Sequence, residues 1–353
     1  MLSYRALSAV ALFTLVLSLP SAVSAADAPS FAGKTVTVII GATPGGATDT
    51  FGRLSAAYIA EALPGRPAAV ARNAPGAGGV VALNSFYKQA KPDGLTIATG
   101  AGTQSDPLNY RSVNALYDLA KLEYIGGVGR TGTVIVINKQ AVPRLHDKSQ
   151  PPVTLGALSA IRSGMQMTLW GTEYLGWNVR WVTGYPGNNE LVLALQRKEI
   201  DMTSLATVDE IEMLLKSGDF TTVTQSGALI DGKQVPQPAY GGAPILGDLL
   251  AGKLTDPLAQ QAFEYWKNTT QVGQWLALPP GTPAPIVAVY RDAFVKTLSN
   301  PEFIDKLKRV NTDIVPMSAG DTTALLKRLA ATSDAALGYM KTMQKKQGIP
   351  TAH

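Results

Sequence analysis

The sequence predicts an α/β protein of two lobes, each built on a mostly parallel sheet flanked by helices. Three strands joined by two loop–helix segments follow one another between residues 34 and 99, which is the pattern of parallel strands joined by helices. A second group of strands and helices begins after Tyr124. The chain has 353 residues, of which 46% are hydrophobic, and this is enough to bury two cores.

The elements of the first group each have a distinct signal. The β-branched run Lys34–Ile40 predicts a buried strand, and apolar residues at helical spacing predict a helix over 48–63 that stops at Pro64-Gly65. A short strand at 68–72 and an apolar helix at 80–89 follow. The turn Pro92-Asp93-Gly94 then leads into a third strand at 95–99.

The second group continues the alternation of strands and helices. We expect strands at 133–138, 165–170, 179–183, 200–203 and 274–278, and helices at 153–161, 189–196, 209–216, 286–298, after Asn300-Pro301, and over 324–347. Only Gly171–Trp177 separates two of these strands, and a parallel crossover needs about ten residues or more.

The N-terminus has the pattern of an export signal. Arg5 precedes an apolar run, Ala6–Leu19, and small residues then lead to Ala25. The run is too short to span a membrane, and no later stretch reaches the ~18 apolar residues that a span needs. We therefore expect residues 1–25 to be a signal peptide, cleaved near Ala25, and the mature chain to be exported and soluble. A retained N-terminal anchor is the alternative.

The composition excludes several kinds of site. There is no cysteine, which excludes a disulfide framework, a thiolate metal site and a cysteine nucleophile. The two histidines, His146 and His353, leave little material for a metal site or for imidazole catalysis, and we interpret His146 as a surface loop residue. The basic residues are scattered, which argues against a nucleic-acid partner. We expect no metal and no cofactor.

Glycine-rich loops follow the first three strands, at Gly41–Gly46, Asn73–Gly79 and Gly102–Ser105. A helix that begins after such a loop has free main-chain N–H groups and a positive dipole end, both of which favour an anion. The carboxyl ends of parallel strands share one edge of the sheet, where open α/β sheets bind ligands. The loops therefore indicate a small-anion site; ordinary tight turns between strand and helix are the alternative.

The first loop departs from a phosphate-binding P-loop at one position. Ala47 stands where that motif has its lysine, so a nucleoside triphosphate does not fit, whereas a carboxylate suits the amides. Thr43 and Thr48 add hydroxyl groups. Asp49 lies in the first helical turn, where it serves either as a partner of the helix dipole or as a ligand contact.

Two other patterns are open to a functional or a structural interpretation. Gly127–Gly132 matches the dinucleotide motif G-x-G-x-x-G, but a strand rather than a helix follows it, so we expect a flexible crossover between the lobes. Trp170, Trp177 and Trp181 cluster in sequence, and they either pack in the core or line a pocket.

Several segments together resemble the Bug family, the extracytoplasmic substrate-binding receptors of tripartite tricarboxylate transporters. The matching segments span most of the chain after the signal: Val36–Ile40, Thr43–Asp49, Asn73–Gly79, Pro92–Gly94, Tyr185–Glu190, Arg197–Asp201, Leu278–Pro283 and Asn300–Phe303. The combination of the first glycine motifs is specific, although each motif alone is not.

The resemblance implies a two-lobed periplasmic-binding-protein fold, also called a Venus flytrap. Residues 26–128 with 272–353 would form the first lobe and 129–271 the second. A small carboxylated solute would lie between the lobes, held by main-chain amides and hydroxyls. The contacts that the resemblance implies in the first lobe, with Asp49 added as a candidate, are Thr43, Gly46, Ala47, Thr48, Gly76, Ala77, Gly78, Thr103 and Gln104.

The second lobe departs from the family pattern. Family members have a glycine- and serine-rich loop and a helix where this chain has only Gly171–Trp177, so the helix that would hold the ligand is expected to be shortened or lost. Gly171 and Thr172 are the expected replacements. Tyr185 and Gly187, in the Tyr-x-Gly turn, are further expected contacts.

These observations favour a monomeric periplasmic solute-binding protein that delivers a small organic acid to the membrane subunits of a transporter. The alternative is a periplasmic ligand-binding partner of a signalling receptor. An exported hydrolase is a third class, but it needs a nucleophile with a base in reach, and the scarcity of histidine argues against it. We therefore expect no enzymatic activity.

Overall fold

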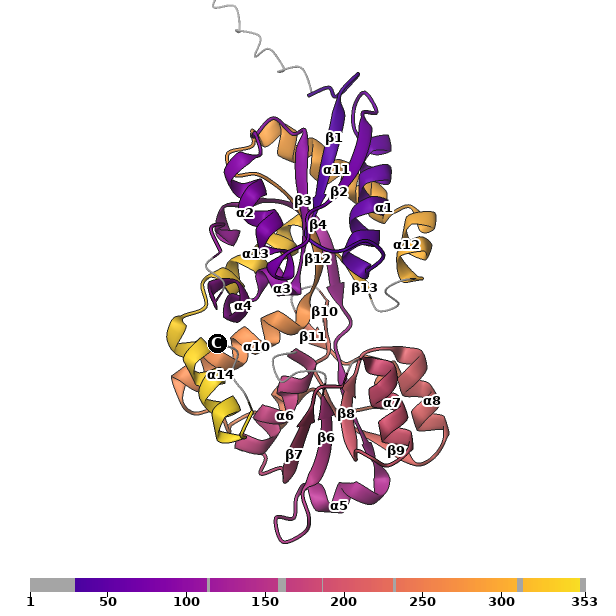
Figure 1. Cartoon of the computed structure of the whole chain (residues 1–353), viewed down its shortest axis with the longest axis vertical. Helices are drawn as coiled ribbons and strands as arrows, with labels where there is room; N and C mark the ends of the chain where they lie inside the picture. Colours follow the sequence, from indigo (N-terminus) through magenta and orange to yellow (C-terminus); the bar gives the residue numbers. More distant parts are fainter. Residues whose placement is uncertain are drawn as a thin grey trace, which may run out of the picture.

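The computed structural model describes residues 29–112, 115–157, 163–185, 187–230, 233–309 and 314–349. The chain forms two lobes, one above the other in Figure 1, and each lobe is a mixed sheet with helices on both faces. The two-lobed α/β fold predicted from the sequence is confirmed. The expected signal peptide lies outside the described residues. Within those residues, none of the helices has both the length and the apolar character to cross a membrane.

The first lobe is built on a six-stranded sheet. Its strands lie in the order β13 (Ile314–Met317), β4 (Glu123–Arg130), β12 (Val272–Leu278), β3 (Thr96–Ala101), β1 (Thr35–Ile40) and β2 (Ala68–Asn73). β2, β1 and β3 are parallel, whereas β12 is antiparallel to both β3 and β4. The three strands that precede the glycine loops therefore end at one edge of the sheet.

Helices cover both faces of this sheet. One face carries α1 (Ala47–Ala62), α11 (Ala284–Leu298) and α12 (Pro301–Lys308), which bury a core with Val38, Phe51 and Phe294. The other carries α2 (Val80–Gln89) and α13 (Ala319–Ala330). The short helices α3 (Gly102–Ser105) and α4 (Pro107–Ser112) follow β3.

The second lobe is built on a five-stranded sheet. Its strands lie in the order β7 (Val179–Thr183), β6 (Val153–Ala157), β8 (Met202–Leu205), β5 (Val134–Asn138) and β9 (Phe220–Gln225). α7 (Asn188–Gln196) and α8 (Val208–Lys216) bury one core with this sheet, and α6 (Ser163–Tyr174) and α10 (Pro257–Gln271) pack on another. The remaining elements are α5 (Val142–Leu145), α9 (Leu246–Leu249) and the hairpin of β10 (Ala228–Ile230) and β11 (Lys233–Val235).

The carboxyl edges of the two sheets lie next to each other. β4 runs in the same direction as β3, because both are antiparallel to β12, so β4 ends at the edge of the glycine loops. β5 is antiparallel to β8 and pairs Val134 with Leu205, so β5 starts at the carboxyl end of β8. Residues 131–133 alone connect β4 to β5, which brings the two edges together where the lobes meet (Figure 1).

Two elements of the second lobe differ from the sequence prediction. The expected helix at 153–161 is a strand, β6, over its described part, and the expected strand at 165–170 lies inside α6. β6 is buried, so its apolar run has no alternation, and α6 is buried nearly all round, so its sequence shows no apolar stripe. A helix, α6, therefore lies between β6 and β7 in the chain, and the expected loss of this helix is wrong.

Two further predictions are corrected. The helix expected over 324–347 is two helices, α13 and α14 (Asp334–Lys346), because Ser333 caps α14 by accepting a hydrogen bond from the Ala336 N–H at 3.2 Å. The segment 127–132 is strand β4 as far as Arg130 rather than a flexible crossover. Its glycines allow close strand packing, since a methyl group at Gly127 would lie 2.5 Å from the Gln274 carbonyl oxygen.

α14 packs against the second lobe, although the expected division assigned it to the first. Its residues share one continuous core with α10 and α6. Trp170 of α6 is fully buried there and stacks on Tyr339 of α14, with ring centroids 6.3 Å apart. Trp177 is also buried in this core, whereas Trp181 is half-buried. For Trp170 and Trp177 the packing interpretation is therefore confirmed.

Candidate functional site

The first glycine loop joins β1 to α1. α1 begins after Gly46, and no side chain caps its first turn. Thr43 and Gly46 are exposed, and Ala47 and Thr48 are half-buried. The amides of this turn therefore lie at the surface of the edge that faces the second lobe, where they can donate to an anion.

The second glycine loop joins β2 to α2 through a strained segment. Gly76, Ala77, Gly78 and Gly79 all have positive φ values, of 142°, 46°, 63° and 94°. Ala77 is the one residue of the four that carries a side chain, and such a conformation costs about 1–2 kcal/mol for an L-residue. Strain of this kind persists where the surrounding structure holds it, and it is frequent at functional sites.

The structure brings the three glycine loops into contact, as the sequence predicts. A methyl group at Gly41 would lie 3.0 Å from the Gly79 Cα, and one at Gly78 would lie 2.9 Å from the Thr103 Cγ2. Gln104 is buried between the loops, and its Oε1 accepts a hydrogen bond from the Ala101 N–H at 2.8 Å. Gln104 therefore fills the space between the loops. Exposed residues of the second and third loops are Gly76, Ala77, Gly78 and Thr103. Their role as ligand contacts stays a prediction.

Asp49 organises the first two loops. Its Oδ2 accepts a hydrogen bond from the Gly45 N–H at 2.9 Å, and its Oδ1 accepts one from Asn73 Nδ2 at 2.7 Å and one from Arg53 Nε at 3.0 Å. Asn73 Nδ2 also donates to the Ala42 carbonyl at 2.9 Å, which ties the second loop to the first. Protein donors thus occupy both carboxylate oxygens, and these contacts support a structural role for Asp49.

The contacts of Asp49 predict a pH-dependent contribution to stability. Burial alone would raise the pKa of its carboxyl, but the hydrogen bonds from Gly45, Asn73 and Arg53 outweigh burial and hold the pKa below its ordinary value of 3.8. The stabilisation is therefore present above pH 3.8 and is lost as the pH falls through the lower folded-state pKa. Asp49→Asn should lower the free energy of unfolding at pH 7 by about 1–3 kcal/mol.

Urea denaturation of wild type and Asp49→Asn between pH 7 and pH 2.5 checks this prediction. The difference between the two proteins should shrink below pH 3.8. Asp334→Asn is the matched control, because Asp334 pairs with Arg111 at 2.7 Å but its side chain is 90% exposed, so its loss should have a much smaller effect. An equal effect of the two substitutions would contradict the role given to Asp49.

The facing edge of the second lobe holds a second group of donors at the start of α6. A methyl group at Gly164, the second residue of α6, would lie 2.7 Å from Ser204 Oγ and 3.0 Å from Thr133 Oγ1. Ser204 is only 6% exposed, and neither hydroxyl has a hydrogen-bond partner among the described residues. Two hydroxyls without a partner among the described residues thus lie beside the positive end of a helix of 12 residues, where a helix dipole favours an anion.

Sequence reasoning missed Ser204 and Thr133. Ser204 is the last residue but one of the short strand β8, and the rule that ligands bind at carboxyl ends of strands would have indicated it. Thr133 precedes a strand that runs in the opposite direction, and the direction of β5 cannot be read from its sequence.

The predicted contacts of the second lobe lie in two places. Tyr185 and Gly187 are half-buried in the loop between β7 and α7, and this loop contacts the end of β6 because the Gly184 N–H donates to the Ala157 carbonyl at 3.1 Å. Gly171 and Thr172 lie in the second half of α6, away from its N-terminus. They were chosen because residues 171–177 were expected to form a loop between two strands, and in the structure residues 171–174 belong to α6. Gly171 and Thr172 are therefore left out of the proposed site.

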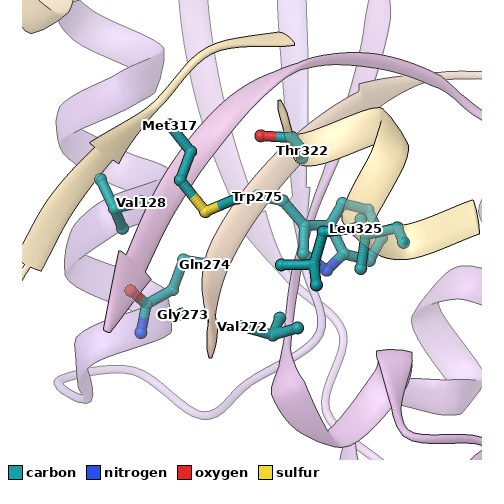
Figure 2. Close-up of a pocket in the computed structure, with 9 residues that line it drawn as sticks. Val128, Val272, Gly273, Gln274, Trp275, Met317, Thr322 and Leu325 are labelled. Carbon is teal, nitrogen blue, oxygen red and sulfur yellow. The ribbon is translucent and has the colours of Figure 1, made fainter. Parts of the chain in front are cut away.

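Two cavities lie elsewhere in the molecule. Figure 2 shows one between β4, β12 and α13, with a volume of about 10 Å³, which leaves room for a single water. A groove of about 530 Å³ lies between α10 and the turn from α13 to α14. The glycine-loop residues line neither of them. In the described ranges, no cluster of three or more histidine or acidic residues is placed to hold a metal ion.

Comparisons with known proteins confirm the resemblance to the Bug family. The chain is 26% identical over 304 residues to a UPF0065 protein of Bordetella pertussis, which covers 82% of this chain and 84% of that protein. No protein-family model matches the chain. Among solved structures, the fold is similar to a TctC solute binding protein from Polaromonas, with a TM-score of 0.67, 17% identity, and 90% of this chain and 100% of that one covered.

Two further structures share the fold. One is the periplasmic binding protein BugD, with a TM-score of 0.51 and 19% identity over 89% of this chain and 98% of BugD. The other is MatC from Rhodopseudomonas palustris with bound malate, with a TM-score of 0.52 and 19% identity over 86% of this chain and 98% of MatC. The fold of the chain is thus shared with a solute binding protein, a periplasmic binding protein and a protein that binds malate.

Proposed function

From this likeness to TctC, BugD and a UPF0065 protein, we propose that the chain is a periplasmic solute-binding protein that captures a small carboxylate between its lobes. One observation carries the proposal. Main-chain donors of the glycine loops lie at one sheet edge, and Ser204 and Thr133 lie beside the α6 N-terminus at the edge that faces it. The protein binds its ligand and does not transform it.

Main-chain amides and hydroxyls are sufficient for this task. Each hydrogen bond from such a donor to a charged group contributes about 1.5–3 kcal/mol, so three or four reach micromolar affinity after the cost of immobilising the ligand. Helix N-termini add favourable dipoles without a lysine or a metal. In the first lobe Thr43, Gly46, Gly76, Ala77, Gly78 and Thr103 offer exposed groups, with Ala47 and Thr48 beside them.

The remaining parts of the proposal concern export and delivery. Residues 1–25 act as the signal peptide, and the mature protein works as a monomer in the periplasm. It passes the acid to the membrane subunits of a tripartite tricarboxylate transporter. The malate bound by MatC supports a small organic acid as the ligand class. The division into 26–128 with 272–353 and 129–271 remains our proposal for the lobes.

Thermal unfolding with a panel of organic acids tests the proposed function. A ligand at 100 times its Kd stabilises the folded protein by about 2.7 kcal/mol, which should raise Tm by several degrees. Mass spectrometry of the small molecules released on denaturation should identify an acid that copurifies with the protein.

Ser204→Ala provides the matched variant for this experiment. It removes one hydroxyl at the α6 N-terminus and should reduce the ligand-dependent shift, while the ligand-free Tm changes little because that hydroxyl has no partner in the described part of the chain. If no acid raises Tm and none is released, the proposed function is wrong. An unchanged shift in Ser204→Ala would contradict the contribution of the second lobe.

A further inference from the structure

The third glycine loop, Gly102–Ser105, is held in part by side chains close to it in the chain. Asn109 Nδ2 donates a hydrogen bond to the Thr103 carbonyl at 2.8 Å. The hydroxyl of the buried Tyr117 donates one to the Gln104 carbonyl at 2.8 Å. These donors follow the residues that they hold by 6 and 13 positions. Such local bonds fix the shape of the loop, and its position in the fold depends on other contacts.

Two distant side chains hold the end of the loop. The Trp275 indole N–H donates to Ser105 Oγ at 2.8 Å, and the Tyr265 hydroxyl donates to Oδ1 of Asp106, the residue after the loop, at 2.7 Å. The Leu108 N–H donates to the same Asp106 oxygen at 2.9 Å. Burial raises the pKa of the Asp106 carboxyl, and the bonds from Tyr265 and Leu108 oppose that rise because they favour its ionised form. Trp275 and Tyr265 are both buried, so water does not replace these contacts.

Tyr265 and Trp275 lie on one continuous segment that runs from the second lobe into the first. Tyr265 belongs to α10, which ends at Gln271, and Trp275 belongs to β12, which begins at the next residue. α10 lies where the lobes meet and packs on α6 and α14, whereas β12 is paired between β3 and β4 (Figure 1). The Tyr265 hydroxyl therefore links the position of α10 to that of the third loop.

The exposed part of the third loop lies against the second glycine loop. Thr103 is exposed, and its Cγ2 lies 2.9 Å from the position that a methyl group would take on Gly78. The Asp106 N–H donates to the Gly102 carbonyl at 2.9 Å, at the end of the short helix α3. Because this helix has only four residues, a shift of Asp106 moves Thr103 with it. The arrangement of the exposed groups therefore depends on where Asp106 is held.

We propose that Tyr265 is a positioning residue of the ligand site: by holding Asp106 it places the third loop for binding, so that the affinity for an acid depends on the position of α10. The inference rests on the proposed function, because it takes exposed groups of the second and third loops as ligand contacts. Tyr265 is buried and acts through Asp106 rather than by touching the acid. Without its hydroxyl the loop is in its binding arrangement for a smaller fraction of the time, and the apparent affinity falls by that fraction.

Isothermal titration of wild type and Tyr265→Phe tests this role. The probes are malate, citrate and benzoate, and the proteins are compared on whichever of these binds wild type most tightly. The substitution removes only the hydroxyl, and the loss of one buried hydrogen bond to a carboxyl group should weaken binding by about 5- to 20-fold.

Tyr290→Phe is the matched control. Tyr290 is also fully buried, and its hydroxyl donates to the carbonyl of Gly94, which precedes β3 and so lies at the edge of the sheet opposite the glycine loops. This variant should lower Tm about as much as Tyr265→Phe does, because each loses one buried hydrogen bond. It should leave binding of the acid within about twofold of wild type.

A double-mutant cycle distinguishes positioning from a general loss of stability. Asp106→Ala lacks the acceptor, so adding Tyr265→Phe to it should weaken binding by less than about twofold further. Combined with Ser204→Ala, in contrast, Tyr265→Phe should keep its full effect, because Ser204 belongs to the facing edge and does not contact this bond.

The Trp275 indole N–H gives a second, spectroscopic readout. It donates to Ser105, the neighbour of Asp106, so its NMR resonance reports the position of the end of the loop. This resonance should shift in ligand-free Tyr265→Phe and stay unchanged in Tyr290→Phe.

The outcomes distinguish this inference from the proposed function. If Tyr265→Phe binds the acid as wild type does, or no more weakly than Tyr290→Phe, the assignment to Tyr265 is wrong while the proposed function stands. The same holds if the effects of Tyr265→Phe and Asp106→Ala simply multiply, or if the Trp275 resonance does not move. If wild type binds none of the three acids, both are contradicted.

Discussion

Gly79→Ala should lower the free energy of unfolding by about 2–4 kcal/mol, because it combines backbone strain with a steric clash. Gly79 has a φ of 94°, which an alanine adopts only with strain. Its new methyl group would lie 1.7 Å from Gln104 Nε2 and 2.7 Å from the Gly41 carbonyl oxygen. Gln104 is buried and held by the Ala101 N–H, so neither neighbour can move away without disturbing the contact between the three loops.

Gly45→Ala separates the two causes. Gly45 has nearly the same φ, 93°, but a methyl group there would meet no atom within 4 Å. Urea denaturation should give a loss of about 1–2 kcal/mol for Gly45→Ala, from strain alone. Gly79→Ala should exceed it by about 1–3 kcal/mol and should also weaken binding of any acid found in the panel. Equal losses for the two variants would show that the loops do not meet at Gly79.

The glycine loops could be predicted because their signals are local. A buried strand such as Lys34–Ile40, a glycine run and a helix are all read from adjacent residues, and parallel strands place such loops on one edge without further information. The contact of Gly79 with Gln104 and Gly41 became visible only in the structure. The position of the loops at one edge of the sheet could be predicted from the sequence. The helix of Val80–Gln89 was predicted with its observed bounds for the same reason.

The second-lobe donors could not be predicted because their partners are distant in sequence. Ser204, Thr133 and Gly164 meet only after β5 pairs with β8 and α6 folds across them. The alternation of Met165, Met167 and Leu169 indicated a strand, whereas these residues and the polar ones between them are buried together in a helix. The spacing of apolar residues in a sequence indicates which face of a helix is exposed to solvent. A helix that is buried nearly all round has no exposed face, so its sequence lacks this signal.

The contacts of α14 with the second lobe could not be predicted from the sequence either. The periodic leucines and methionines of α13 and α14 continue across the break at Ser333, so they suggested one long helix. α14 instead packs on α10 and α6. Tyr339 contacts the Tyr174 hydroxyl, and Lys346 Nζ lies 2.5 Å from Glu173 Oε1. The C-terminal helix thus links the last part of the chain to the second lobe.

Trp170→Ala should remove the side chain that packs between α6, α10 and α14, and it should lower the free energy of unfolding by about 3–5 kcal/mol. Trp170 has no exposed surface, and besides Tyr339 it stacks on Tyr174 at 5.9 Å and meets Phe263 of α10 edge-on at 5.0 Å. Its indole N–H has no hydrogen-bond partner among the residues described, so the loss is one of packing. Trp170→Phe should restore part of the stability because it refills part of the cavity.

Hydrogen exchange measures which helices and strands lose stability in Trp170→Ala. In Trp170→Ala, amide exchange should accelerate in residues 334–346 and in α6 more than in β1 or α1, because the stacked rings join the former elements and not the latter. Tyr339→Phe removes only the hydroxyl contact with Tyr174 and should cost about 1 kcal/mol or less. Uniform acceleration across both lobes, or a loss in Trp170→Ala no larger than in Tyr339→Phe, would show that α14 is held by something other than this aromatic stack.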